Sequence, residues 1–513
     1  MPRPERASPR SVADASIEEL RTARDELRDE VRALIASGDV DEDQFAANEL
    51  AWAYARAEAA EACQAWADAT GSAIAQGIAA AAVAEGLEEL GKRRKTAISG
   101  RAFEAITLDA TSLADLGATD EQRILRRTFR DFARTKIAPR AAAIHRSDLD
   151  IPEDVIRGVA ELGVFGLSIP EAYGGSQGAR EDFEAMLIVT EELSHASLAA
   201  GGSLITRPEI LVRALVRAGT TKQKERWLPA IASGRQLVAV ATTEPDFGSD
   251  VAGLRCRAER TPAGWLVTGT KLWCTFAGRA ELLMLLLRTG EHGHRGLSVF
   301  VLEKPAFAGH DFVFEEPRGG MLRGRAIPTI GYRGMHTFEL AFDRFVLPES
   351  ALVGGDEWLD RGFYLQLESF AIGRLQTAAR GVGVMQAALE ATLRYTSQRV
   401  VFSRAISEFG LPRATLGRMA VHLSAARQLS YRAARLVARG EGQMEASLAK
   451  LYASRAAERV TRDAMQLHGG MGYAEETDVS RYFVDARVLS IFEGAEDVLA
   501  LRVIAKSLLR PPS

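Results

Sequence analysis

The stretch that decides the fold contains five short apolar runs, LVAVAT at 237–242, GWLVTG at 264–269, LLMLLLR at 282–288, LSVFVL at 297–302 and TFELAF at 337–342. Gly, Pro and Asp residues separate these runs. Short apolar runs bounded by turn residues are typical of β-strands. The sequence therefore predicts a small antiparallel β domain in the middle of the chain.

Helical patterns flank this domain on both sides. Three helices are expected over residues 16–98, because Ser16 opens an S-x-x-E capping box ahead of an apolar pattern at helical spacing. A second helical stretch is expected to begin near Thr119, to end at Pro139 and to resume at Pro152. Long helical patterns return in the C-terminal part of the chain, as in a helical bundle.

The predicted fold class is thus mainly α with a central β domain. Four segments are expected, an N-terminal helical extension at 1–108, an α domain at 109–236, a middle β domain at 237–355 and a C-terminal helical bundle at 356–513. A chain of 513 residues agrees with this number of domains, since a domain has roughly 150 residues.

Composition excludes several classes of protein. The chain has 64 Lys+Arg against 68 Asp+Glu and a formal net charge of -4, which argues against a nucleic-acid partner because phosphate neutralisation requires a sustained basic face. Three cysteines, Cys63, Cys256 and Cys274, fit neither a disulfide framework nor a CxxC metal site, so we expect a reducing compartment, the cytoplasm, and no metal. No apolar stretch reaches the roughly 18 residues of a membrane-spanning helix, so no membrane partner is expected.

Seven motifs carry the chemistry. They are PEAYGG (170–175), KERWLP (224–229), TEPDFGSD (243–250), GTKLWCT (269–275), RVVF (399–402), QLHGGMGY (466–473) and IFEG (491–494). In these motifs and their order the chain resembles the acyl-CoA dehydrogenase family, over about residues 119–510. The resemblance implies a helical domain, a small β-barrel domain and a C-terminal four-helix bundle, preceded here by an extra helical segment. It also implies FAD as cofactor and an acyl-CoA thioester as substrate.

Glu493 is the candidate catalytic base. A thioester α-proton is a weak acid, so its removal needs a carboxylate in a dry pocket and a donor for the enolate oxygen. The resemblance implies that Glu493 takes this proton while the flavin takes the β-hydride, with Gly494 giving room for substrate. The alternative is a glutamate favoured by a helix N-terminus. Some family members carry the base one residue before an arginine, but the residue before Arg374 is Gly373. Arg374 is expected to bind CoA or to hold the bundle.

The resemblance also implies a set of flavin contacts. Thr242, Thr243, Ser249, Trp273 and Thr275 would bind the FAD of their own subunit. A buried tryptophan and hydrogen-bonded strand threonines are the structural alternative. Arg399, Phe402, Gln466, Gly469 and Gly470 would reach the FAD of a neighbouring subunit, so the resemblance implies at least a dimer.

The chain departs from the family pattern at two places. Ala495, Glu496 and Asp497 follow the Glu-Gly pair where the family often has Thr-x-Gln, which leaves the adenine contacts open. Ser403 stands where glycine is usual.

The substrate is expected to be short and methyl-branched. Within the family, the N-terminal extension and the stretch GRAIPTIGYRGMH at 324–336 resemble the branch that converts (2S)-methylsuccinyl-CoA to mesaconyl-CoA in the ethylmalonyl-CoA pathway. A free substrate carboxylate needs a cationic partner. Arg207 is the first candidate, with a surface arginine that caps a helix end before Pro208 as the alternative, and Arg333 and His336 are second candidates.

The remaining expectations concern partners and alternatives. The family implies transfer of electrons to an electron-transferring flavoprotein. The extension is expected to serve assembly and to favour a homodimer. Alternative functions are a general short- or branched-chain acyl-CoA dehydrogenase, an acyl-CoA oxidase, or a flavoprotein relative without dehydrogenase activity.

Overall fold

The computed structural model describes residues 16–35, 39–41, 43–91, 110–178, 182–291 and 293–509, apart from the side chains of 110–112, 367 and 368. The chain divides into two compact units. The bundle unit comprises residues 1–130, 183–195 and 377–513, and the sheet unit comprises 131–182 and 196–376. The expected boundary between residues 108 and 109 falls outside the described residues, and the other segment boundaries stay predictions.

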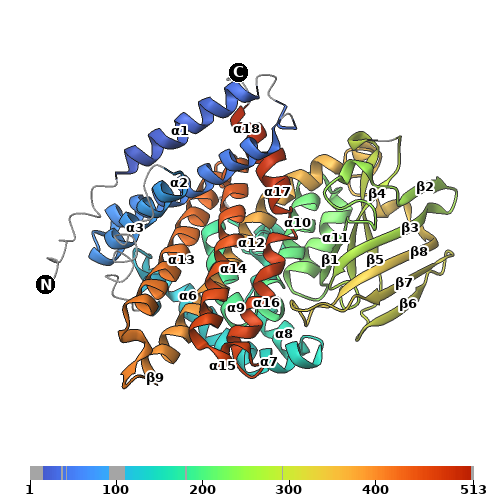
Figure 1. The fold of residues 1–513 in the computed structure, drawn as a ribbon. Helices are drawn as coiled ribbons and strands as arrows, with labels where there is room; N and C mark the ends of the chain where they lie inside the picture. The colour runs from blue at the N-terminus through green and yellow to red at the C-terminus, as the bar shows by residue number, and fades with distance from the viewer. Residues whose placement is uncertain are drawn as a thin grey trace, which may run out of the picture. The chain divides into compact units, whose positions relative to one another are not determined.

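The bundle unit is built from helices. They are α1 (Ile17–Leu34), α2 (Gln44–Thr70), α3 (Ala73–Glu89), α5 (Ala110–Asp115), α6 (Asp120–Phe132), α9 (Phe183–Ala196), α12 (Gly362–Gln398, from Thr377 onward), α13 (Gly410–Val437), α14 (Gln443–His468), α15 (Gly470–Tyr473), α16 (Asp478–Arg487), α17 (Glu496–Val498), the π-helical segment η12 (Leu499–Ala505) and α18 (Lys506–Leu509). Figure 1 shows α13 and α14 side by side, and they pack against each other along their length. Helices α12, α13, α14 and α16 supply the expected C-terminal bundle.

The three helices of the N-terminal extension form as the sequence predicts. Ser16 caps α1 by accepting a hydrogen bond from the backbone N–H of Glu19 at 3.1 Å, which is the expected capping box in part. Helix α2 ends at Gly71, whose φ of 61° is a left-handed conformation that glycine adopts without strain. The extension therefore begins and ends its helices where local sequence signals place them.

The extension joins the core of the bundle unit. Helix α2 packs against α3, α13 and α14, and its Leu50 is fully buried in one core cluster with Leu448, Leu451 and Ile504. The Arg455 guanidinium of α14 lies 3.7 Å from the ring centroid of Trp52. Burial of this apolar surface makes the extension part of the folded bundle.

The helix before Pro139 does not end there, contrary to the sequence prediction. The chain stays helical through the π-helical segment η2 (Ala133–Ile137) into α7 (Ala138–Ser147). Pro139 is the second residue of α7 and follows directly after the π-helical segment, where the regular hydrogen bonding of an α-helix is already interrupted, so the missing N–H is tolerated. The turn falls at Asp148 instead, which has a φ of 49°, and α8 (Glu153–Glu161) follows Pro152 as expected.

The sheet unit contains one eight-stranded sheet. Its strands are β1 (Val238–Ala241), β2 (Arg257–Thr261), β3 (Gly264–Thr275), β4 (Leu282–Arg288), β5 (Leu297–Glu303), β6 (Asp311–Glu315), β7 (Met321–Ala326) and β8 (Thr337–Leu347). The order is β1-β4-β2-β3-β8-β7-β6, with β5 also paired to β4. Among the described strands the sheet does not close on itself, since its path ends at β1 and at β6. The β domain is therefore a half-barrel.

The sheet is mixed, and the purely antiparallel sheet that we expected is wrong. Strand β4 pairs in parallel with β1 and with β2, whereas the other pairs are antiparallel. The five apolar runs all form strands, but β2, β6 and β7 were missed. Each of these three strands exposes at least two side chains, so one of its faces is polar. They were missed because no continuous apolar run marks them in the sequence.

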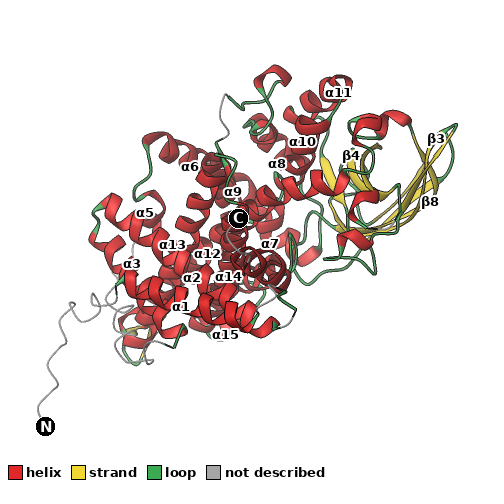
Figure 2. Ribbon diagram, turned by 90° about the horizontal axis from the view of Figure 1, so that it is seen from above, coloured by secondary structure: helices red, strands yellow, loops and turns green. Residues whose placement is uncertain are grey.

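Two helices cover the apolar face of the sheet. Helices α10 (Thr206–Ala218) and α11 (Thr221–Ala232) share a core cluster with β1, β4 and β5, in which Leu215, Leu228, Met284 and Val299 are buried. Figure 2 shows α10 and α11 beside β4 in the sheet unit. This packing anchors the N-terminal end of α10, where Arg207 lies.

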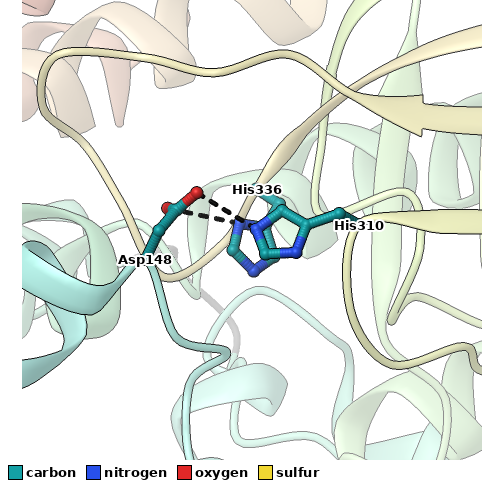
Figure 3. Close-up of side chains that lie close together, drawn as sticks. All are labelled: Asp148, His310 and His336. Atoms are coloured by element: carbon teal, nitrogen blue, oxygen red, sulfur yellow. Dashed lines mark hydrogen bonds and ion pairs between the residues drawn. The ribbon is translucent and has the colours of Figure 1, made fainter.

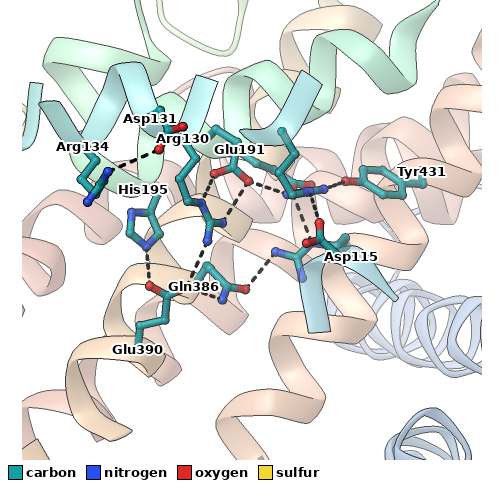
Figure 4. A network of polar contacts seen from close by, with 12 residues as sticks. Asp115, Arg130, Asp131, Arg134, Glu191, His195, Gln386, Glu390 and Tyr431 are labelled. Carbon is teal, nitrogen blue, oxygen red and sulfur yellow. Dashed lines mark hydrogen bonds and ion pairs between the residues drawn. The ribbon is translucent and has the colours of Figure 1, made fainter. Parts of the chain in front are cut away.

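A network of buried charges holds α6 and α9 to the bundle (Figure 4). The Arg126 guanidinium lies 3.1 Å from Glu191 and 2.6 Å from Glu192, and all three side chains are at most 5% exposed. Glu390 of α12 lies 2.9 Å from the His195 ring. Such charges are stable in a protein interior only when they are paired in this way. Within the described part of the chain, no helix is both long and apolar enough to cross a membrane.

Candidate active site

Glu493 lies in a strained turn of the bundle unit. Its φ is 53°, a left-handed conformation that is uncommon for a residue with a side chain and that is concentrated at functional sites. Gly494 follows with a φ of 99°, and a Cβ atom there would lie 2.9 Å from the Leu499 side chain. The buried ammonium of Lys450 donates a hydrogen bond to the Gly494 carbonyl at 2.6 Å. The surrounding structure therefore fixes the turn.

The position of Glu493 counts against a simple helix-capping role. Helix α17 begins at Glu496, with Ala495 as its N-cap, and the acidic residues of its first turn are Glu496 and Asp497. Glu496 also pairs with Arg455 at 2.7 Å. The carboxylates that favour the helix N-terminus are thus the later two. Glu493 is half-buried and lies outside the helix, so its side chain remains available for chemistry.

In the sheet unit, a buried ion pair holds the segment after β1. The Lys271 ammonium, fully buried, lies 2.8 Å from Glu244 and donates to the Thr242 carbonyl at 3.0 Å. Glu244 also accepts hydrogen bonds from the backbone N–H groups of Arg255 and Cys256. The backbone of Thr242 and its neighbour Thr243 is therefore fixed against β3, and Thr243 accepts a hydrogen bond from the Leu272 N–H at 2.8 Å.

Trp273 lies in a β-bulge. The pairing of β3 with β8 shifts register between Lys271 and Cys274, and Trp273 in between has a φ of 60° and is 53% exposed. Bulges redirect side chains and are frequent beside active sites. The interpretation of Trp273 as a buried core residue is therefore wrong.

The threonines and the serine differ in their surroundings. The Thr242 hydroxyl is buried and has no hydrogen-bond partner among the described residues. By contrast, the Thr275 hydroxyl lies 3.1 Å from that of Thr337, as a structural threonine would. Ser249 is exposed in the loop before the short helix at Val251–Gly253. The segment of the buried, unpartnered threonine hydroxyl is hydrogen-bonded through Thr243 to Leu272, the residue before the strained and exposed Trp273. A free hydroxyl and an exposed indole fit the ring edge and face of a flavin.

The residues assigned to a neighbouring subunit's flavin lie at exposed positions of the bundle unit. Phe402 is 92% exposed at the tip of a hairpin between β9 (Val400–Val401) and β10 (Arg404–Ala405). Phe402 and Ser403 have φ values of 48° and 63°, as in a type I′ turn, which explains why glycine suits the position of Ser403.

The other members of this set lie at the ends of α12 and α14. Tyr395 of α12 stacks on His468 of α14 with ring centroids 4.3 Å apart, which brings the two helix ends together. Four exposed residues follow or flank these two rings in the sequence, namely Arg399, Gln466, Gly469 and Gly470. An exposed set of this kind is suited to a partner or a ligand.

Arg207 is buried, so the interpretation as a surface arginine is wrong. Its side chain is 6% exposed at the start of α10. The guanidinium donates from Nη1 to the Ser203 carbonyl at 3.3 Å and to the Tyr332 hydroxyl at 2.9 Å. Both acceptors are neutral, and no ion pair joins Arg207 to a carboxylate within the part of the chain that the structure describes. A buried guanidinium whose described hydrogen-bond acceptors are neutral is suited to bind an anion.

The other cationic candidates have different environments. Arg333 donates to the carbonyls of Thr329 and His145 at 2.9 and 2.8 Å, so it serves to hold backbone. Arg374 is 9% exposed and lies over the Phe370 ring at 6.0 Å. His336 faces Asp148 and Asp150.

Sequence reasoning missed four residues that position these groups. Tyr332 binds Arg207, Lys450 holds the turn at Gly494, and Lys271 with Glu244 holds Thr242. Lys271 and Glu244 lie inside two of the quoted motifs, and that position was the available signal. Tyr332 lies inside the quoted stretch 324–336, whereas nothing local in the sequence marks Lys450.

Comparisons with known proteins identify the class. Three domain profiles of one family match the chain, the N-terminal domain of acyl-CoA dehydrogenase at residues 119–235, the middle domain at 239–345 and the C-terminal domain at 360–509. The chain therefore belongs to the acyl-CoA dehydrogenase family, whose members are FAD-dependent oxidoreductases that act on acyl-CoA.

Among individual relatives, the chain is 36% identical over 533 aligned residues to (2S)-methylsuccinyl-CoA dehydrogenase of Cereibacter sphaeroides, an alignment that covers 95% of each chain. This alignment therefore includes most of the N-terminal extension.

Solved structures confirm the fold. Butyryl-CoA dehydrogenase from Megasphaera elsdenii is 28% identical with a TM-score of 0.70, and the match covers 77% of this chain and 99% of that one. The same identity, TM-score and coverage are found for a structure described as the electron-transferring flavoprotein of Acidaminococcus fermentans.

Proposed function

We propose that this acyl-CoA dehydrogenase oxidises (2S)-methylsuccinyl-CoA to mesaconyl-CoA, the step of the ethylmalonyl-CoA pathway. The observation that carries the proposal is the buried Arg207, whose hydrogen bonds go to neutral oxygens. A dicarboxylic acyl group brings one free carboxylate, and a charge-assisted, bidentate pair with Arg207 would compensate its burial. The alignment of the extension with the methylsuccinyl-CoA relative supports the same substrate.

The proposed roles follow the chemistry of each group. FAD, when bound, supplies the acceptor for the hydride from the substrate β-carbon. Glu493 takes the α-proton, and its backbone N–H donates to the thioester oxygen. Gly494 leaves room for the thioester because it lacks a side chain. Arg374 binds the CoA portion.

The flavin contacts are proposed in two sets. Thr242 and Thr243 hydrogen-bond the ring edge, Trp273 and Thr275 flank the ring, and Ser249 binds the pyrophosphate. Arg399, Phe402, Gln466, Gly469 and Gly470 contact the flavin of a neighbouring subunit, so we propose a homodimer as the smallest active assembly. The 92% exposure of Phe402 supports this role, since a large apolar side chain in that setting is suited to a partner surface.

We also propose that the electrons leave to an electron-transferring flavoprotein and that the enzyme works in the cytoplasm. The structural match to the Acidaminococcus fermentans protein supports the first assignment. The three cysteines are free and buried, which is consistent with a reducing compartment.

The test is anaerobic reduction of the flavin. The purified enzyme is mixed with (2S)-methylsuccinyl-CoA or with butyryl-, isobutyryl- or isovaleryl-CoA, and the loss of flavin absorbance is followed. We expect rapid bleaching by the dicarboxylic thioester. Faster bleaching by a monocarboxylic thioester would overturn the substrate and favour a general short- or branched-chain dehydrogenase. A flavin that none of the four reduces would overturn the dehydrogenase activity on short acyl groups.

A further inference from the structure

Three loops of the sheet unit bring Asp148, His310 and His336 together (Figure 3), and Asp150 lies beside His336. Asp148 and Asp150 lie between α7 and α8, His310 directly precedes β6, and His336 directly precedes β8. Nε2 of His310 lies 3.0 Å from Oδ2 of Asp148, and Nδ1 of His336 lies 3.6 Å from Oδ1 of the same carboxylate. The two imidazole centroids are 4.2 Å apart.

We propose that Asp148, His310 and His336 form a site for a divalent first-row transition metal, with Zn²⁺ as the expected occupant. A carboxylate and two imidazole nitrogens are donors that zinc prefers. The three donor groups all lie within 4.8 Å of one another. Bonds of about 2.0–2.1 Å in a tetrahedral arrangement place donor atoms roughly 3.3 Å apart. The His310 nitrogen lies 3.0 Å from one oxygen of Asp148 and the His336 nitrogen lies 3.6 Å from the other, so both separations are close to that value.

Asp150 completes the site from outside. Its Oδ1 lies 2.9 Å from Nε2 of His336, the nitrogen on the far side of the ring from Asp148. Its Oδ2 accepts a hydrogen bond from the backbone N–H of Gly309 at 2.9 Å. A metal-bound histidine usually donates its second N–H to a carboxylate, which fixes the ring and strengthens it as a ligand. With Zn²⁺ and two neutral imidazoles, the two carboxylates would make the cluster electrically neutral.

The backbone supports the arrangement. Asp148 and His336 both have left-handed conformations, with φ values of 49° and 41°. Non-glycine residues adopt this region at some cost, and the structure around them maintains it. The His336 side chain is 5% exposed, whereas those of Asp148 and His310 are 34% and 50% exposed. The site is therefore open to solvent on one side, which gives an ion a way in.

The metal would fix the loop that supports Arg207. His336 ends the segment that contains Tyr332, whose hydroxyl accepts the hydrogen bond from Arg207. The Gly334 carbonyl of that segment accepts a hydrogen bond from the Ile151 N–H at 3.1 Å, next to Asp150. A bound ion would join these loops through metal–ligand bonds, in addition to the hydrogen bonds that already connect them. Its role is structural, and it does not depend on the identity of the substrate.

Metal binding is measured directly on the full-length, FAD-loaded protein. The protein is stripped with a chelator and dialysed against buffered Zn²⁺, and zinc per chain is determined by elemental analysis. We expect one zinc per chain for the wild type. His310→Gln and Asp148→Asn should each weaken binding at least tenfold, and Asp150→Asn should weaken it by about 10–100-fold as for the outer partner of a ligand.

His294→Gln is the matched control, because His294 is also an exposed histidine of the sheet unit and lies beside Phe363 at 5.7 Å, away from the aspartates. It should bind zinc like the wild type. Saturating Zn²⁺ should also raise the Tm of the wild type and of His294→Gln but not of His310→Gln. Less than one zinc per chain at saturation, or equal affinity of His310→Gln and wild type, would overturn the proposal.

Discussion

The ammonium of Lys271 lies 2.8 Å from the carboxylate of Glu244, and the two side chains are 0% and 5% exposed. Lys271→Met leaves the Glu244 charge buried without its partner, so we expect the free energy of unfolding to fall by about 3–5 kcal/mol. The Thr242 carbonyl loses its donor as well, so FAD should dissociate more readily. Urea unfolding and flavin retention on a desalting column measure the two effects.

The control for this pair is Arg260→Met. Arg260 pairs with Glu349 at 3.0 Å in the same unit, but both side chains are 49% exposed. Exposed pairs contribute little. Equal destabilisation by the two substitutions would contradict the importance of burial.

Glu493→Gln should abolish turnover while FAD remains bound. The amide keeps the shape of the side chain but cannot accept the α-proton, and loss of a general base lowers the rate by about 10²–10⁴-fold. Single-turnover flavin reduction measures the effect. Glu496→Gln, three residues further on and paired with Arg455 at 2.7 Å, should reduce the flavin at nearly the wild-type rate. Substantial reduction by the Glu493 variant would remove its assignment as base.

Arg207→Met should change substrate preference. The variant keeps roughly the volume of the side chain but removes the cation. A hydrogen bond to a charged group contributes up to roughly 3 kcal/mol, so kcat/KM for methylsuccinyl-CoA should fall by about 10²-fold. The value for butyryl-CoA should change much less, since that thioester has no carboxylate for Arg207. Tyr332→Phe, which removes only the 2.9 Å hydrogen bond to Arg207, should give a smaller loss. A parallel loss for both substrates would argue for a purely structural Arg207.

Ser403→Gly should stabilise the protein. Ser403 has a φ of 63°, and glycine adopts that conformation without the roughly 1 kcal/mol that a side chain costs there. We expect a small rise in Tm in a thermal scan. The comparison is Ser397→Gly, an exposed position near the end of α12, where loss of helix propensity should lower Tm instead. A lower Tm for Ser403→Gly would mean that the hairpin needs the serine hydroxyl.

Glu390 should make the fold sensitive to acid. Burial alone would raise the pKa of Glu390, but the hydrogen bond and charge of His195, the Gln386 amide and the charge of Arg130 lower it from 4.5 to about 2. Because the folded-state pKa is depressed, its contribution to stability is present above pH 4.5 and is lost as the pH falls towards 2. A shift of this size corresponds to about 3 kcal/mol.

The check is urea unfolding of wild type and Glu390→Gln from neutral pH down to about pH 3. The variant should be less stable at neutral pH and should lose less stability on acidification. Glu121→Gln, at an exposed position of α6, should follow the wild type. If the acid slopes of all three agreed, Glu390 would not be the titrating group.

Local sequence signals predicted the fold well where one residue's neighbours decide its conformation. The apolar runs formed strands, and Ser16 and Gly71 bounded helices as expected. The prediction failed at Pro139, because the helix passes there through a π-helical segment that tolerates a residue without an N–H. It also missed β2, β6 and β7, whose polar faces interrupt the apolar pattern.

The candidate site was predictable only where the motif lies in one short stretch. The candidates Glu493 and Trp273 were proposed from their own motifs, whereas their left-handed backbone conformations could not be predicted. The burial of Arg207 could not be predicted either, since its partner Tyr332 is 125 residues away.

The sequence by itself determined the succession of helical and β segments and the class of chemistry, because periodicity, capping and short motifs are local properties. Only the tertiary structure decided which charges are buried and what faces them. Arg207 meets a tyrosine hydroxyl, and His310 and His336 meet at Asp148. These contacts depend on how segments that are remote in the sequence pack together, because the free energy of a buried charge is set by the groups around it in space.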